Sequence, residues 1–232
     1  MTLPTVKSMF SATVCAVVLV FSVLAHATEN QAILTANGPS YTFSPTITSF
    51  GNGGTVGWAF QVAAGVNLSI DHLGLYDNGD VALSSSHPVE LWDSNYNLLA
   101  QVTIPSGVGA NYLSGYTYQA LGTPVTLNAG ATYYVGAYYP SGCGDEILVT
   151  GTTQQFNTNL TFLNPQQTSF DSTQTSIAFP SIANSPTGTY KEGWFGPTLE
   201  FTTTVIPEPS TNALLTLSLV VLMVGSQRKQ RE

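Results

Sequence analysis

Apolar and polar residues alternate along much of the middle of the chain. In Val56–Val62 every second residue is large and apolar, a period of two that predicts a β-strand with one buried face. Further along, Leu68 and Ile70 keep one phase, whereas Leu73 and Leu75 keep the opposite one. An extra residue in a strand reverses its phase, so we expect a β-bulge near Asp71–His72.

Two of the predicted strands form a hairpin. The alternating residues around Val89–Leu91 are followed by the turn-forming residues Asp93–Asn95 and then by a second alternating run, Leu98–Ile104. Two such runs joined by a short polar turn are typical of a β-hairpin.

The second half of the chain continues in short strands. An aromatic strand, Tyr133–Tyr139, follows a turn at Asn128–Gly130, and further strands are predicted at Phe156–Phe162 and Trp194–Val205. The polar stretch Asn164–Thr175 between them is predicted to be a long loop. Short strands at intervals of about 8–12 residues predict an all-β fold, a two-sheet antiparallel sandwich.

The N-terminus has the three parts of a secretory signal peptide. Lys7 supplies a positive charge, Val14–Leu24 is apolar, and Ala25 and Ala27 form an A-x-A cleavage site. Residues 1–27 are therefore predicted to be removed on export by signal peptidase. The apolar run is too short for a transmembrane anchor.

The C-terminal tail, residues 205–232, also has three ordered parts. These are Pro207, Glu208 and Pro209, then an apolar run from Ala213 to Val224, then the cations Arg228, Lys229 and Arg231. The two prolines end any strand before them. The apolar run with its flanks is about 17 residues, near the short end of the ~20 that span a bilayer. We expect a transmembrane helix, with the basic end holding the C-terminus on the cytoplasmic side.

In this order, the three parts of the tail resemble the PEP-CTERM sorting signal of Gram-negative bacteria. The resemblance implies recognition by an exosortase-type membrane transpeptidase and processing at or near Pro207–Pro209. The helix would then hold only the precursor in the inner membrane, and the product would reach the cell surface or the extracellular polysaccharide.

The domain between the two signals, residues 28–204, is strongly acidic. It contains eleven acidic residues and one basic residue, Lys191, which gives a net charge of −10 against −8 for the whole chain. Such a surface repels nucleic acid and anionic membranes and attracts cations. Its single cysteine is Cys143, because Cys15 lies in the signal peptide, too early for lipid attachment.

Cys143 has no cysteine within the domain with which to form a disulfide. Asp145 and Glu146 follow it closely and would raise its pKa, which disfavours a catalytic nucleophile. Pairing between chains and an incidental thiol remain the two interpretations.

Several short motifs in the centre, roughly Gly54–Pro140, resemble an uncharacterised domain that recurs in exported bacterial proteins. They are Val56–Phe60, Leu73–Asp77, Gly79–Asp80, Glu90–Asp93, Leu98–Ala100 and Tyr134–Tyr139. The resemblance implies a jelly-roll-like sandwich and no particular activity.

Catalytic motifs are not evident in the sequence. There is no G-x-S-x-G, no H-E-x-x-H and no phosphate loop. Asp71 and His72 are adjacent, which in a regular strand sends them to opposite faces. His87 precedes Pro88 and has no cysteine or histidine at ligand spacing. We therefore expect no enzyme; a glycoside hydrolase would need opposed carboxylates on facing elements.

Asp77, Asn78 and Asp80 are the candidate metal ligands. With Gly79 they form a turn that could offer calcium several oxygen atoms, although not at the spacing of an EF-hand. The alternative is an ordinary Asn-Gly turn with solvated acids. No cofactor is assured by the sequence, and calcium is the candidate.

Tyr134 and Tyr138 are the candidate sugar-stacking residues. They share one strand face, and Tyr133 and Tyr139 share the other, so we expect one pair to be exposed. An exposed tyrosine packs its ring on a sugar while its hydroxyl stays in water. The alternative is that these rings pack the two sheets together.

The sequence as a whole predicts an exported surface or matrix protein with a non-catalytic, structural or adhesive role in an exopolysaccharide layer. The alternative is a calcium-assisted carbohydrate-binding module, and a glycoside hydrolase is third.

Overall fold

A computed structural model describes residues 30–34, 53–77, 82–147, 155–168, 174–183 and 195–206. The described strands form three sheets, and every pairing among them is antiparallel. The five-stranded sheet has the order β1 (Asn30–Gln31), β13 (Pro197–Val205), β4 (Val66–Tyr76), β8 (Tyr116–Leu127), β7 (Tyr112–Leu113). The six-stranded sheet has the order β12 (Ile182–Ala183), β11 (Leu160–Gln167), β3 (Gly54–Val62), β9 (Thr132–Tyr139), β5 (His87–Asp93), β6 (Leu98–Ile104). A small sheet pairs β10 (Gln155–Phe156) with β2 (Ile33–Leu34).

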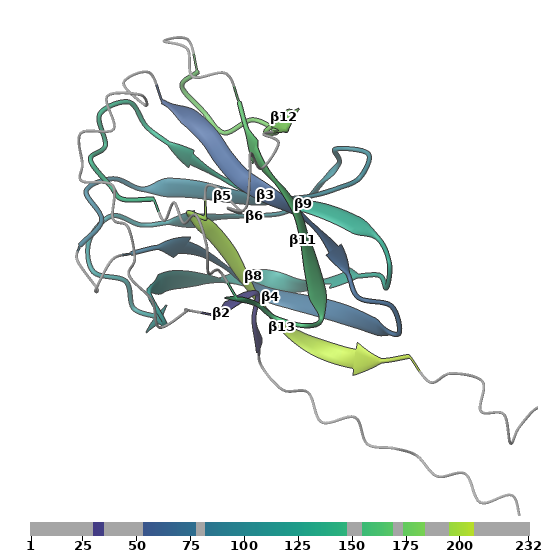
Figure 1. The fold of residues 1–232 in the computed structure, drawn as a ribbon. Coiled ribbons are helices and arrows are strands. Elements are labelled where there is room, and N and C mark those ends of the chain that lie inside the picture. Colours follow the sequence, from purple (N-terminus) through teal and green to yellow (C-terminus); the bar gives the residue numbers. More distant parts are fainter. Residues whose placement is uncertain are drawn as a thin grey trace, which may run out of the picture.

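The two large sheets form two layers around one core. In Figure 1 the layer with β4, β8 and β13 lies below the layer with β3, β5, β6 and β9. Trp58 of β3 is fully buried and donates a hydrogen bond from Nε1 to the Pro197 carbonyl of β13, at 2.8 Å. The all-β, antiparallel two-layer prediction is therefore confirmed for the described residues.

The phase change in β4 is a β-bulge, as predicted. The register between β4 and β8 shifts between Ile70 and His72. Leu68 and Ile70 before the shift, and Leu73 and Leu75 after it, are all fully buried. The extra residue lets both halves of one long strand bury their apolar side chains in the same core.

The predicted loop at Asn164–Thr175 is wrong in its first part. Residues 164–167 continue β11 and pair with β3, with a register shift between Phe162 and Asn164. Pro165 and the polar residues beside it gave no strand pattern in the sequence. A strand next to a bulge tolerates proline, and Gln166 is almost completely buried there.

A short segment, residues 174–183, covers part of the outer face of the six-stranded sheet. Gln174 and Ala178 both donate hydrogen bonds to the Thr55 hydroxyl of β3, at 2.9 and 3.1 Å. These contacts cover Thr55, and β3 as a whole is buried on both faces from Gly54 to Phe60, although its alternation predicts only one buried face.

The two helices predicted at the chain ends lie outside the described residues. Within the described ranges there is no helix that has the length and apolar character needed to cross a membrane.

Candidate functional site

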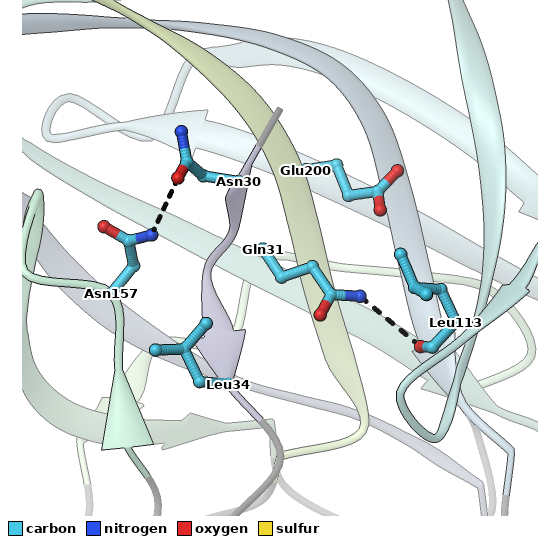
Figure 2. Close-up of a pocket in the computed structure, with 6 residues that line it drawn as sticks. All are labelled: Asn30, Gln31, Leu34, Leu113, Asn157 and Glu200. Carbon is cyan, nitrogen blue, oxygen red and sulfur yellow. Dashed lines mark hydrogen bonds between the residues drawn. The ribbon is translucent and has the colours of Figure 1, made fainter. Parts of the chain in front are cut away.

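A groove of about 330 Å³ lies beside β1 and β2 (Figure 2). Its lining combines amide, carboxylate and leucine side chains: Asn30, Gln31, Leu34, Leu113, Asn157 and Glu200. These residues come from four separate parts of the chain: residues 30–34, Leu113, Asn157 and Glu200. The fold brings them together because β1 pairs with β13, and β10 pairs with β2.

Hydrogen bonds hold the amides of the groove in place. Gln31 Nε2 donates to the Leu113 carbonyl at 3.4 Å and to the Tyr118 hydroxyl at 3.3 Å, and Asn157 Nδ2 donates to Asn30 Oδ1 at 3.5 Å. Leu113, half exposed, supplies an apolar surface beside them. Fixed amides next to an apolar surface can hydrogen-bond a hydroxyl-rich ligand and pack against its apolar face.

The sequence did not indicate this groove. Asn30, Gln31 and Asn157 carry no motif, and only strand pairing across more than 100 residues places them side by side.

The two candidate stacking tyrosines do lie on one face of β9, opposite Tyr133 and Tyr139. Tyr138 is only 6% exposed, and its hydroxyl donates to the Gln174 carbonyl at 2.9 Å. Tyr133 and Tyr139 are also buried, in the core. The expectation of an exposed pair is therefore wrong, because residues 174–183 cover this face.

Tyr134 lies in a cluster of rings on the outer face, which we call the outer aromatic cluster: Trp92, Tyr96, Tyr134 and Phe179. Phe179 contacts the other three, with ring centroids at 5.6, 4.3 and 5.0 Å from Trp92, Tyr96 and Tyr134. Burial, and then the neighbouring Tyr96, raise the pKa of Tyr134. Tyr96, at 61% exposed, is the ring of this cluster that is most accessible to a ligand.

Of the three candidate calcium ligands, Asp77 lies within the described residues and Asn78 and Asp80 lie outside them. Asp77 is 2% exposed, and its Oδ2 accepts a hydrogen bond from the Thr117 hydroxyl at 3.0 Å. This carboxylate is thus held against β8, and calcium binding by the turn stays a prediction.

Asp71 and His72 do not point to opposite faces, contrary to the expectation for a regular strand. His72 Nδ1 lies 3.0 Å from Asp71 Oδ1 and 3.6 Å from Glu200 Oε2. The bulge between Ile70 and His72 breaks the alternation and brings the two neighbours together.

Cys143 has a histidine beside it that its sequence neighbourhood does not reveal. His87, the first residue of β5, packs against Tyr139 and lies with Asp145 close to the thiol. Both of its ring nitrogens face oxygen atoms: Nδ1 is 3.0 Å from the Tyr138 carbonyl and Nε2 is 2.8 Å from Asp145 Oδ2. Neither nitrogen is placed to accept a proton from the thiol.

The pKa values around Cys143 also disfavour a nucleophile. Burial is the largest cause that raises the pKa of the thiol; backbone hydrogen bonds partly oppose it, and the charge of Asp145 adds to the rise. The sequence predicted the direction, but from the charges of Asp145 and Glu146 and not from burial. Burial alone would raise the pKa of Asp145, but hydrogen bonds from His87 and Ser84 outweigh it, so this pKa is lowered.

The sorting residues, namely Ala25, Ala27, Pro207, Glu208, Pro209, Arg228, Lys229 and Arg231, lie outside the described residues.

The described strands define an antiparallel two-layer β-sandwich domain. The chain belongs to the DUF4082 family, a domain of unknown function, whose model matches residues 42–194. The match includes Gly54–Pro140, where the short motifs lie. No curated protein matches the chain.

Proposed function

We propose that this chain is an exported surface or extracellular-matrix protein of a Gram-negative bacterium. A signal peptide directs export, and an exosortase-type transpeptidase processes the tail. The observation that carries this proposal is the position of the fold between the two signals. β1 begins at Asn30, shortly after Ala27, and β13 ends at Val205, two residues before Pro207. The described strands thus begin after the proposed signal-peptide cleavage site and end before the proposed processing site, so neither cleavage would cut a described strand.

The proposed role of the sandwich is non-catalytic, structural or adhesive, in an exopolysaccharide layer. The strand orders β1-β13-β4-β8 and β3-β9-β5-β6, in which most chain connections pass from one sheet to the other, support a jelly-roll-like topology. Jelly rolls are common among lectin and capsid domains.

Sorting is tested by the mass of the surface form. In a host that carries the exosortase-type system, we expect the wild-type product to lack both the signal peptide and the C-terminal helix. The triple variant Pro207→Ala, Glu208→Gln, Pro209→Ala should accumulate as a membrane-bound precursor, whereas Thr211→Ala should be processed normally. A surface product that keeps residues 213–224, or normal processing of the triple variant, would contradict the proposal.

The groove favours a second function, carbohydrate binding, with calcium as the assisting ion. Its amides and leucines offer hydrogen bonds and apolar contact to a sugar. The test is binding of the purified chain to the exopolysaccharide of the host, first with calcium and then with chelator.

Gln31→Ala or Asn157→Ala should weaken such binding by roughly fivefold, the value of about one hydrogen bond. Gln101→Ala, which removes an exposed amide from β6, should leave it unchanged. Loss of binding on chelation would favour the turn at Asp77, Asn78 and Asp80. Saturable binding that none of these changes affects would exclude the groove, and no binding would leave the structural role.

A further inference from the structure

Three side chains with metal-binding donor atoms meet at one end of the six-stranded sheet. His87 begins β5, and Cys143 and Asp145 lie in the loop that follows β9. Their donor atoms, a ring nitrogen, the thiol sulfur and a carboxylate oxygen, all lie within 4.8 Å of one another. In a tetrahedral zinc site with bonds of about 2.0–2.3 Å, donor atoms are roughly 3.3–3.8 Å apart. Shifts of about 1 Å would therefore close these three around one ion.

The histidine is oriented as a metal-binding histidine should be. Its Nδ1 lies 3.0 Å from the Tyr138 carbonyl, which can only accept a hydrogen bond. A ligating histidine typically donates its second ring N–H to such a carbonyl, which fixes the tautomer. This leaves Nε2 facing Asp145 Oδ2, at 2.8 Å, and the His87 side chain is fully buried.

The carboxylate is held by groups outside the cluster. The Ser84 N–H donates to Asp145 Oδ1 at 2.6 Å, and the Ser85 N–H and the Ser84 hydroxyl donate to Oδ2 at 3.1 and 2.9 Å. The Asp145 side chain is only 6% exposed. In metal sites, hydrogen bonds of this kind from neighbouring groups hold the ligating side chains in position.

The loop conformation places the thiol beside these two groups. Gly142 and Gly144 flank Cys143 with φ angles of 69° and 75°, which other residues rarely adopt. The Cys143 N–H donates to the Pro140 carbonyl at 3.2 Å and closes the turn.

We propose that His87 Nε2, Cys143 Sγ and Asp145 bind a divalent transition-metal ion of the Zn²⁺ type. Nitrogen and sulfur donors suit zinc and its neighbours, whereas calcium prefers oxygen alone. The thiolate of Cys143 is the form that binds the ion, so binding displaces the thiol proton and releases it to solvent. Water or the Ser84 hydroxyl completes the fourth position.

The experiment is a titration of the reduced, metal-free full chain with Co²⁺, followed by competition with Zn²⁺. All proteins carry Cys15→Ser, so that Cys143 is the only thiol. Tetrahedral Co²⁺ with a thiolate ligand has an intense sulfur-to-metal charge-transfer band in the near ultraviolet. We expect this band at one equivalent of Co²⁺ and its loss on addition of Zn²⁺.

Cys143→Ser should abolish the charge-transfer band and weaken Zn²⁺ binding at least tenfold. Its side chain is partly exposed and similar in shape, so the variant should fold. His72→Gln is the matched control, because His72 also lies beside carboxylates, Asp71 and Glu200, and should leave both readouts unchanged. The absence of the band in the parent protein, or its persistence in Cys143→Ser, overturns the proposal.

Discussion

Gly57 lies at the centre of the six-stranded sheet, where β3 passes close to β9. It pairs with Gly136, and a Cβ atom added at Gly57 would sit 1.9 Å from the Val135 carbonyl oxygen and 2.7 Å from the Gly136 Cα. All of its nearest neighbours are backbone atoms of β9, which cannot rotate away as a side chain can. Gly57→Ala therefore forces the two central strands apart.

The expected loss of stability in Gly57→Ala follows from this geometry. Overpacking a close-packed site costs about 1–3 kcal/mol, and a clash with paired backbone lies at the upper end. We expect a loss of about 3 kcal/mol in the free energy of unfolding. For a domain of this size, this loss corresponds to a drop in Tm of roughly 6–12 °C.

The assay is thermal and urea unfolding followed by circular dichroism, with Gly122→Ala as the control. Gly122 also lies in a strand, β8, but its added Cβ would have no heavy atom within 4 Å. The control should stay within about 0.5 kcal/mol of the wild type or be slightly more stable. If the Tm of Gly57→Ala lies within about 2 °C of the Tm of this control, the inference that β3 and β9 leave no room for a Cβ at Gly57 is refuted.

Two further changes test the outer face of the same sheet. Burial raises the pKa of Glu90, so the folded state favours its protonated form. The free energy of unfolding therefore falls as the pH rises from below the ordinary pKa of a glutamate through the raised pKa. Glu90→Gln should be more stable than wild type at neutral pH but not at acidic pH by urea unfolding; equal stability at both would contradict this. Phe179→Ala should cost about 1–3 kcal/mol, because it removes ring contacts to Trp92, Tyr96 and Tyr134. It should also shift tryptophan fluorescence to longer wavelength, and unchanged fluorescence with unchanged stability would refute the covering role of residues 174–183.

The sequence predicts well those features that depend on neighbouring residues. The sequence predicted three such features: the alternation in Val56–Val62, the hairpin at Asp93–Asn95 and the bulge near Asp71–His72. Each depends on the period or the turn-forming residues of a short segment. Asp93 shows why the hairpin turn is readable: its Oδ1 accepts hydrogen bonds from the N–H groups of Asn95 and Asn97, at 2.8 and 2.9 Å.

Features that depend on which strands become neighbours were not predictable. His87 and Asp145 are 58 residues apart and meet only because β5 pairs with β9, whose following loop carries Asp145. The groove beside β1 depends in the same way on the pairing of β1 with β13. The burial of Tyr138 depends on residues 174–183. Their sequence has no apolar period from which contact with a sheet could be predicted.

The same topology limits how much a bound metal ion could stabilise the fold. β5 and β9 are already joined by pairs from Val89–Ala137 to Asp93–Tyr133. An ion held by His87, Cys143 and Asp145 would therefore fasten the loop after β9 to a strand that this loop already adjoins. Because binding stabilises only those states in which the site is formed, the main effect should be on local opening of residues 141–147. The sandwich core, which rests on Trp58 and its buried neighbours, should form with or without the ion.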